Sequence, residues 1–253
     1  MAVVATLTNE TMDTREFRTE TGQQVTAVTA AEMREVDRVA VEEFGLSLLQ
    51  MMENAGRNLA SLVRETGSGP VVVLAGNGGN GGGGLSAARH LANRDVDVSV
   101  VLDRSPDGLD GAARTQYETL AAMGVPVDDG AAALAGRDPK TVVDALVGYG
   151  LEGALRGTAG ELVTEVEAVD ATVVSLDVPS GMVATTGKRP GPAVEPDHVL
   201  TLALPKTGLL ECRGDLSLGD IAIPSGVYHS LDVPYANPFD TAYRIALTSE
   251  SKR

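Results

Sequence analysis

The sequence has no tryptophan, only one cysteine and few aromatic residues of any kind. Cys212 alone cannot close an internal disulfide bond and has no second metal-type ligand near it, so nothing calls for an oxidising compartment. No run approaches the roughly 18 uncharged apolar residues that a membrane span needs, and the first residues lack the basic-then-apolar order of a secretory signal. We therefore expect a cytoplasmic protein with no membrane partner.

Basic residues are also scarce, since 20 Lys and Arg stand against 35 Asp and Glu, and the net charge is -15. Phosphate backbones are bound by clustered Lys and Arg, so this balance argues against nucleic acid as a partner. Lysine is rarer than arginine and occurs at four positions: Lys140, Lys188, Lys206 and Lys252. Few lysines with many carboxylates indicate a surface built for high salt, and we expect a halophilic protein.

The length and the apolar content predict one large domain. The chain has 253 residues, 43% of them apolar, which is enough for a sizeable core. Residues 1–23 are polar and lack apolar periodicity, which predicts a flexible tail, followed by a domain over 24–235 and a C-terminal extension over 236–253. Two smaller domains remain an alternative, and the oligomeric state is open, a homodimer being one option.

Two capping boxes predict helices at the start of this domain. Thr29 and Glu32 form the first box, and Ser47 and Gln50 form the second. Apolar residues recur at helical spacing after each box until a glycine ends the pattern, near position 45 and near position 67.

From Pro70 onward, short β-branched runs alternate with helical stretches, which is typical of βαβ units around a parallel sheet. Six runs predict strands: Val71–Ala75, Val96–Leu102, Val142–Leu146, Val173–Val178, Val199–Leu204 and Ile221–Ile223. Helices are predicted between them over Leu85–Ala92, Gly111–Met123 and Glu161–Val169. Right-handed crossovers place such helices on both faces, so the predicted fold is α/β: a three-layer, Rossmann-like, open and mostly parallel sheet.

Ligands of open α/β sheets bind beyond the carboxyl ends of the strands, where this sequence places a glycine-rich stretch. Residues 76–84 contain seven glycines, interrupted by Asn77 and Asn80, and lead into the helix expected from Leu85. A tight turn needs only one or two glycines. Unblocked N–H groups beside a helix N-terminus form a phosphate site, so we predict a loop that binds a nucleotide-like ligand.

The same stretch matches the dinucleotide pattern G-x-G-x-x-G through Gly76, Gly78 and Gly81, with Asp103 after the next strand. An NAD-dependent oxidoreductase is therefore one alternative. A run so rich in glycine matches the pattern partly by chance, and no catalytic Lys, Tyr or His is placed beside a nicotinamide.

Two aspartates, Asp144 and Asp177, stand at the ends of the third and fourth predicted strands. A carboxylate among apolar strand residues is costly to bury unless it is hydrogen-bonded, bound to a cation or working as an acid or base. Either one alone could cap a loop. Two of them opposite the glycine stretch predict a functional site.

Several motifs together carry a resemblance to a known family. They are Met52-Glu53-Asn54-Ala55-Gly56, the stretch Gly78–Gly84 with Leu85–Leu91, the segments around Asp144 and Asp177, Leu204–Leu209, Gly214–Leu216 and Asp220–Pro224. In these motifs and their order, roughly from residue 25 to residue 235, the chain resembles the YjeF N-terminal domains that act as NAD(P)H-hydrate epimerases.

The resemblance implies an isomerase that interconverts the R and S forms of hydrated NADH or NADPH at the C6 hydroxyl, with Asp177 as the acid-base residue. It also implies a potassium ion, K⁺, held by Asn80, Asp144 and Ser180. The implied substrate contacts come from three parts of the chain: Gly79, Asn80, Gly81, Gly82 and Gly83; Gly148, Tyr149, Gly150, Leu151, Glu152, Gly153 and Ala154; and Asp177.

The sequence departs from the family pattern at Gly79 and Gly83, where an asparagine and an aspartate are expected. An alternative from another functional class is therefore a ligand-binding or interaction module that has kept the fold and lost the chemistry.

The acidic composition gives a first testable prediction. Salt screens repulsion between like charges, so molar KCl should raise the melting temperature of this chain. Thermal unfolding followed by circular dichroism from low salt to molar KCl measures this directly. A melting temperature that falls as KCl is added would refute the high-salt interpretation.

Overall fold

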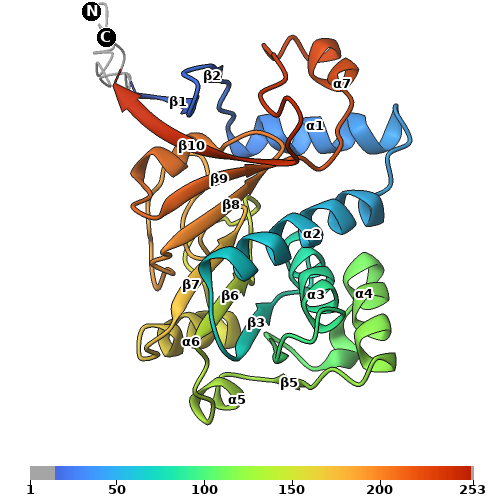
Figure 1. Cartoon of the computed structure of the whole chain (residues 1–253), viewed down its shortest axis with the longest axis vertical. Helices are drawn as coiled ribbons and strands as arrows, with labels where there is room; N and C mark the ends of the chain where they lie inside the picture. The colour runs from blue at the N-terminus through green and yellow to red at the C-terminus, as the bar shows by residue number, and fades with distance from the viewer. Residues whose placement is uncertain (1–14, 252–253) are drawn as a thin grey trace, which may run out of the picture.

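The computed structural model describes residues 15–251, which contain a ten-stranded sheet in the order β2-β1-β10-β9-β8-β7-β6-β3-β4-β5 (Figure 1). The strands from β9 to β5 in this order run parallel: β3 (Val71–Ala75), β4 (Val98–Leu102), β5 (Val127–Asp129), β6 (Thr141–Ala145), β7 (Thr172–Leu176), β8 (His198–Leu202) and β9 (Asp215–Gly219). Three antiparallel strands complete one edge: β1 (Arg15–Thr19), β2 (Gln24–Val25) and β10 (Arg244–Ser251).

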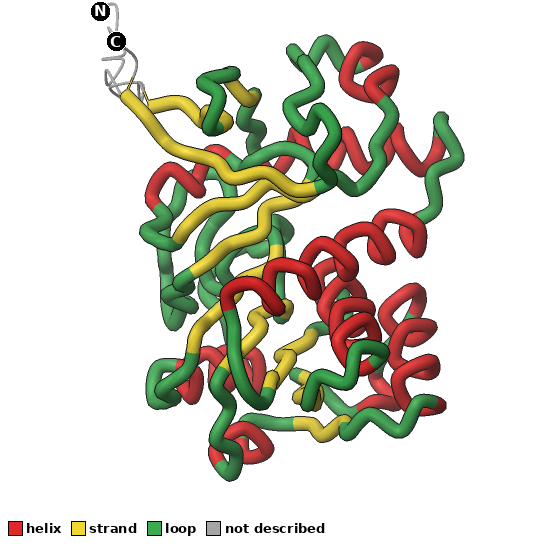
Figure 2. Tube along the Cα trace, in the orientation of Figure 1, coloured by secondary structure: helices red, strands yellow, loops and turns green. Residues whose placement is uncertain are grey.

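Helices cover both faces of this sheet (Figures 1 and 2). On β3, Val71 and Val73 pack in one buried cluster with apolar residues of α2 (Leu48–Thr66), α3 (Gly79–Ala92) and α4 (Gly111–Ala122). The alternate residues Val72 and Leu74 pack on the other face, against α5 (Ala132–Ala135) and α6 (Gly157–Val166). Successive side chains of a strand point to opposite faces, so these clusters confirm the predicted three-layer α/β fold. No helix over residues 15–251 is both long and apolar enough to cross a membrane.

Both capping boxes are confirmed. Thr29 opens α1 (Ala30–Glu42), where its hydroxyl accepts a hydrogen bond from the Glu32 backbone and the Glu32 carboxylate accepts one from the Thr29 backbone. Ser47 and Gln50 make the same reciprocal pair at the start of α2. These caps satisfy N–H groups that a helix start leaves unpaired.

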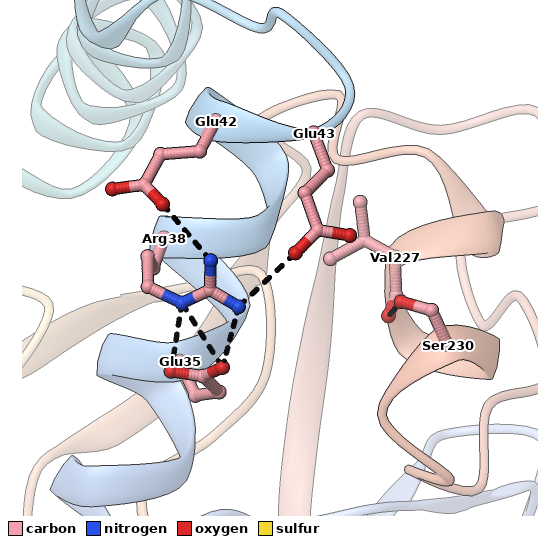
Figure 3. A network of polar contacts seen from close by, with 6 residues as sticks. All are labelled: Glu35, Arg38, Glu42, Glu43, Val227 and Ser230. Carbon is pink, nitrogen blue, oxygen red and sulfur yellow. Dashed lines mark hydrogen bonds and ion pairs between the residues drawn. The ribbon is translucent and has the colours of Figure 1, made fainter.

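The outer face of α1 carries a network of charges, in which the Arg38 guanidinium contacts Glu35, Glu42 and Glu43 (Figure 3). In the neighbouring α7 (Ser225–Ser230), the Ser230 hydroxyl donates to the Val227 carbonyl at 2.8 Å. All four charged side chains of the network are exposed to solvent, where ion pairs stabilise a fold little. The network therefore supports α1 locally, and the buried apolar residues of α1 fix the position of the helix on the core.

The largest difference from the prediction lies in the glycine stretch. Helix α3 begins at Gly79, six residues before the expected Leu85, so the loop after β3 is short. A Cβ atom on Gly82 would lie 2.5 Å from Cε of Met52, and one on Gly83 would lie 2.8 Å from Cδ2 of Leu176. Close packing against α2 and the sheet thus holds the glycines in a helix that their propensity alone disfavours.

The sixth predicted strand, Ile221–Ile223, is wrong. The strand at this place in the sheet is β9, in which Leu216 and Leu218 are buried and alternate with polar residues. This alternation differs from the continuously apolar runs that predict doubly covered strands, which is why β9 was not predicted. The two isoleucines lie in a loop that packs against α1 and α7. The other five predicted strands are present, shifted by at most two residues at each end.

The predicted flexible tail over residues 1–23 is wrong where the structure describes it, because Arg15–Thr19 form β1 and Phe17 is buried. Residues 1–14 lie outside the described part of the chain. Strand β10 lies in the predicted C-terminal extension and pairs with both β1 and β9. Pairing between chain segments more than 220 residues apart leaves no local pattern in either segment.

The glycine positions of α3 give a prediction with a matched control. A Cβ atom on Gly81 would overlap the carbonyl oxygen of Gly76, whereas a Cβ atom on Gly79 would meet no atom within 4 Å. Gly81→Ala should therefore lower the free energy of unfolding by about 3 kcal/mol or more, because backbone must move. Gly79→Ala should be neutral or stabilising by up to about 1 kcal/mol. Urea unfolding of the two variants compares them, and equal effects would contradict this packing.

Candidate active site

The loops after β3, β6 and β7 line a cavity of about 630 Å³ at the carboxyl edge of the sheet. The chain runs from β3 outward through β4 to β5, then returns to β6 on the other side of β3. Such a reversal of direction opens a crevice between the two loops that leave the central strands. The cavity therefore lies where the topology of an open sheet predicts a ligand.

Asp177 follows β7 and lines this cavity. Its backbone φ is +66°, a value that residues other than glycine rarely adopt. Its Oδ1 atom accepts hydrogen bonds from the Lys206 ammonium, the Thr201 hydroxyl (3.4 Å) and the Leu202 backbone (3.3 Å). Its Oδ2 atom accepts one long bond, from the backbone N–H of Tyr149 at 3.3 Å. One oxygen is thus held by the protein, and the other has capacity for a ligand.

Lys206 is the partner that holds Asp177. Its side chain is 1% exposed, and besides the ion pair it donates to the carbonyl of Leu202 at 3.0 Å. Its ammonium also lies 5.6 Å from the centre of the Tyr149 ring. Lys206 was not among the predicted site residues, although it lies within the motif Leu204–Leu209. Lys206 and Asp177 are 29 positions apart, so no short sequence spacing indicates that the two side chains meet.

A second polar pair forms the neighbouring wall, where the hydroxyl of Tyr149 donates to Asp37 of α1. Burial raises the pKa of Asp37 above its ordinary value. Burial and then the nearby Asp37 carboxylate raise the pKa of the Tyr149 hydroxyl, so it remains a donor. Asp37 was missed because it sits within an ordinary amphipathic helix pattern.

Asp144 is the penultimate residue of β6 and is completely buried. Its carboxylate accepts hydrogen bonds from the Ser175 hydroxyl (2.7 Å) and from both the backbone N–H (2.8 Å) and the hydroxyl (2.5 Å) of Ser180. Burial raises the pKa of Asp144, and these donors oppose that effect. The carboxylate therefore ties the end of β6 to the loop after β7.

Asn80 has an amide that the protein leaves without a partner. Both amide atoms are buried, and neither makes a hydrogen bond within residues 15–251. A Cβ atom placed on Gly148 would lie 3.1 Å from the amide oxygen of Asn80 and 3.2 Å from Oδ2 of Asp177. An unpaired buried amide is costly, so this pattern indicates a ligand or ion between the two loops.

The cavity brings together some of the predicted substrate residues and not others. Those that line it are Gly79, Asn80, Gly148, Tyr149, Gly150 and Asp177. Those that do not line it are Gly81, Gly82 and Gly83, buried within α3, and Leu151, Glu152, Gly153 and Ala154, farther along the loop after β6. Of the predicted ion ligands, Asn80 lines the cavity and Asp144 and Ser180 lie buried outside its lining.

The two departures from the family pattern differ in their surroundings. A Cβ atom on Gly83 would point at Leu176 (2.8 Å) and Ala55 (3.7 Å), inside the core between α2, α3 and β7. Gly79 faces open space in the cavity wall. A side chain at position 83 would therefore begin inside the core, whereas a side chain at position 79 would begin in the cavity wall.

Comparisons with known proteins identify the family that this chain resembles. The family model described as "YjeF-related protein N-terminus" matches residues 48–208. An NAD(P)H-hydrate epimerase of Dehalogenimonas lykanthroporepellens is 46% identical over 93% of this chain and 98% of its own length. A bifunctional NAD(P)H-hydrate repair enzyme of Hyperthermus butylicus is 38% identical over 87% of this chain, which spans only 42% of that longer protein.

A solved structure supports the fold. The crystal structure of a yeast protein superposes with a TM-score of 0.76, covering 88% of this chain and all of that chain at 24% identity. At this identity the likeness concerns the arrangement of the strands and helices alone.

The buried Lys206–Asp177 pair gives a prediction. Lys206→Met should lower the free energy of unfolding by about 3–5 kcal/mol, because the Asp177 carboxylate is left buried without its cation. The double variant Lys206→Met/Asp177→Asn removes that charge and should lose clearly less than the sum of the two single losses. Urea unfolding of all three variants completes the cycle. Strictly additive losses would show that the two side chains are not coupled.

Proposed function

This chain belongs to the family of YjeF-related N-terminal domains, and from that premise we propose that it is an NAD(P)H-hydrate epimerase. The substrate is hydrated NADH or NADPH, and the reaction interconverts the R and S forms at the C6 hydroxyl. The observation that carries the proposal is the carboxylate of Asp177 in the cavity lining, which is anchored through Oδ1 and accepts only one long hydrogen bond on Oδ2.

The geometry gives Asp177 a specific task. C6 of the hydrated ring carries the hydroxyl and is bonded to the ring nitrogen, so loss of the hydroxyl proton allows that carbon–nitrogen bond to open. Oδ2 of Asp177 accepts this proton as C6 becomes a carbonyl carbon and the ring nitrogen takes the electron pair of the broken bond. The nitrogen then attacks either face of the carbonyl carbon, and Asp177 returns the proton to the oxygen. The Lys206 ammonium, the Thr201 hydroxyl and the Leu202 backbone N–H all donate to Oδ1 and hold the carboxylate in place through both steps.

The glycine-rich start of α3 serves the phosphates of the substrate. Gly78 and Gly79 line the cavity at the N-terminus of α3. Helix N-termini bind anions through free N–H groups and the helix dipole. The diphosphate therefore lies over α3 while the damaged ring lies at Asp177. The α3 end of the site binds the substrate, and the Asp177 end carries out the reaction.

The proposal includes a potassium ion beside Asn80. Asn80, Asp144 and Ser180 would hold it, and the unpartnered amide of Asn80 is the structural support for this assignment. All three residues offer oxygen atoms, which hard cations prefer. When bound, K⁺ would offset the negative charge of the diphosphate.

Mutation of Asp177 tests the reaction. Asp177→Asn should slow equilibration of purified R-hydrate toward the S form by about 10²–10⁴-fold, because the proton acceptor is lost. Asp240→Asn is the matched control, since Asp240 is an exposed carboxylate that also has a positive φ, +49°. Chromatographic separation of the epimers with time measures both. A wild-type protein that fails to accelerate equilibration would leave the ligand-binding module as the alternative.

The ion site has its own test. The wild type should equilibrate the hydrates faster in KCl than in NaCl of equal ionic strength, and Asn80→Ala should lose that difference. K⁺ should also stabilise the wild type over Na⁺, by up to about 2.7 kcal/mol at 100 times its Kd, because an ion bound to the folded state shifts unfolding. Equal rates and equal melting temperatures of the wild type in the two salts would refute the assignment.

A further inference from the structure

Two charged residues of the cavity take no part in the site as described so far. Asp103 and Arg104 follow β4 and line the same cavity as Gly78 and Gly79. The Arg104 guanidinium donates two hydrogen bonds to the Asp103 carboxylate, at 2.8 and 3.0 Å. Asp103 is nearly buried, whereas 44% of the Arg104 side chain is exposed. A fixed carboxylate and a movable guanidinium therefore meet at this end of the cavity.

The order of the strands sets where this pair lies relative to Asp177. The neighbours β7, β6, β3 and β4 contribute, in that spatial order, Asp177, the loop at Gly148, the start of α3 and the Asp103–Arg104 pair. Adjacent strands lie about 4.8 Å apart, so three steps separate the two ends by roughly 14 Å. The site is thus a row of strand ends, with the start of α3 between Asp177 and Asp103.

The backbone around β3 and β4 has the layout of a dinucleotide-binding unit. A strand, a short glycine turn, a helix N-terminus and a second strand with an acidic end follow one another, and the N–H of Asp103 donates to the carbonyl of Ala75 at 3.1 Å. In such units the acidic residue binds the 2′-hydroxyl of the adenosine ribose, and a nearby arginine accommodates a 2′-phosphate.

On the basis of the proposed function, we infer that Asp103 and Arg104 form the subsite for the adenosine ribose of the hydrated dinucleotide. With NADH hydrate, the Asp103 carboxylate accepts a hydrogen bond from the 2′-hydroxyl. With NADPH hydrate, Arg104 turns from Asp103 to the 2′-phosphate. The exposure of its side chain permits this movement, and the planar guanidinium suits a phosphate because it presents several donors in one plane. Arg104 thereby allows the phosphorylated substrate to be used.

The cavity offers a matched control for this role. Arg34 is also an exposed arginine of the lining, on α1, beside the Tyr149–Asp37 pair. It therefore belongs to the end of the cavity away from β4. An effect of general positive charge should appear in variants of either arginine, whereas an effect on the 2′-phosphate should appear only at Arg104.

The test compares both hydrates with the wild type, Arg104→Gln and Arg34→Gln. Arg104→Gln should lower kcat/KM for NADPH hydrate by about tenfold or more, and by less than about twofold for NADH hydrate, because charge-assisted hydrogen bonds to the 2′-phosphate are lost. Arg34→Gln should leave the ratio of the two values unchanged. Equal losses for both hydrates in Arg104→Gln would overturn the assignment.

A binding measurement separates this inference from the proposed reaction. In calorimetry, adenosine 2′,5′-bisphosphate should bind the wild type more tightly than 5′-AMP does, and Arg104→Gln should remove that preference. If neither hydrate is epimerised but the preference is present and depends on Arg104, the reaction fails and the subsite stands. If the protein is active and shows no preference, the subsite fails and the reaction stands.

Discussion

The close approach of Gly76 to the carbonyl of Leu146 is the constraint on which the site depends. A Cβ atom on Gly76 would overlap that carbonyl oxygen, so the loops leaving β3 and β6 touch only because position 76 has no side chain. These are the strands at which the chain reverses its direction across the sheet. The contact closes the base of the crevice, and beyond it the two loops diverge around Asn80, Gly148 and Asp177.

Two buried carboxylates then stabilise this arrangement in different ways. Asp144 is surrounded by hydroxyl and backbone donors and joins β6 to the loop after β7. Asp177 instead meets a buried ammonium at the cavity, and its second oxygen accepts a single long hydrogen bond. Two neighbouring strands thus lead into carboxylates of different surroundings, one enclosed by donors and one with an oxygen that can accept a further hydrogen bond.

Much of the sheet and of the cavity lining could be predicted from the sequence, because buried parallel strands leave a local pattern of consecutive apolar residues. Continuous apolar runs located five of the parallel strands, and their carboxyl ends meet at one edge, which is why Asp177 and Gly148 were expected together. The rest depends on contacts between distant segments. β10 pairs with β1, and Lys206 reaches Asp177 from beyond β8, so no local spacing records either. The start of α3 was missed for the opposite reason, because strong local glycine signals were overridden by packing against Met52 and Leu176.

The glycines of α3 also bear on the order in which the molecule folds. Each glycine in a helix costs about 1 kcal/mol relative to alanine, so the five between Gly79 and Gly84 weaken the first turns by about 5 kcal/mol. Such a segment cannot become helical by itself and must wait until α2 and the sheet are assembled around it. The start of α3, which forms part of the cavity wall, therefore depends on the surrounding core for its helical conformation. A ligand bound there requires α2, α3 and the sheet to be assembled together.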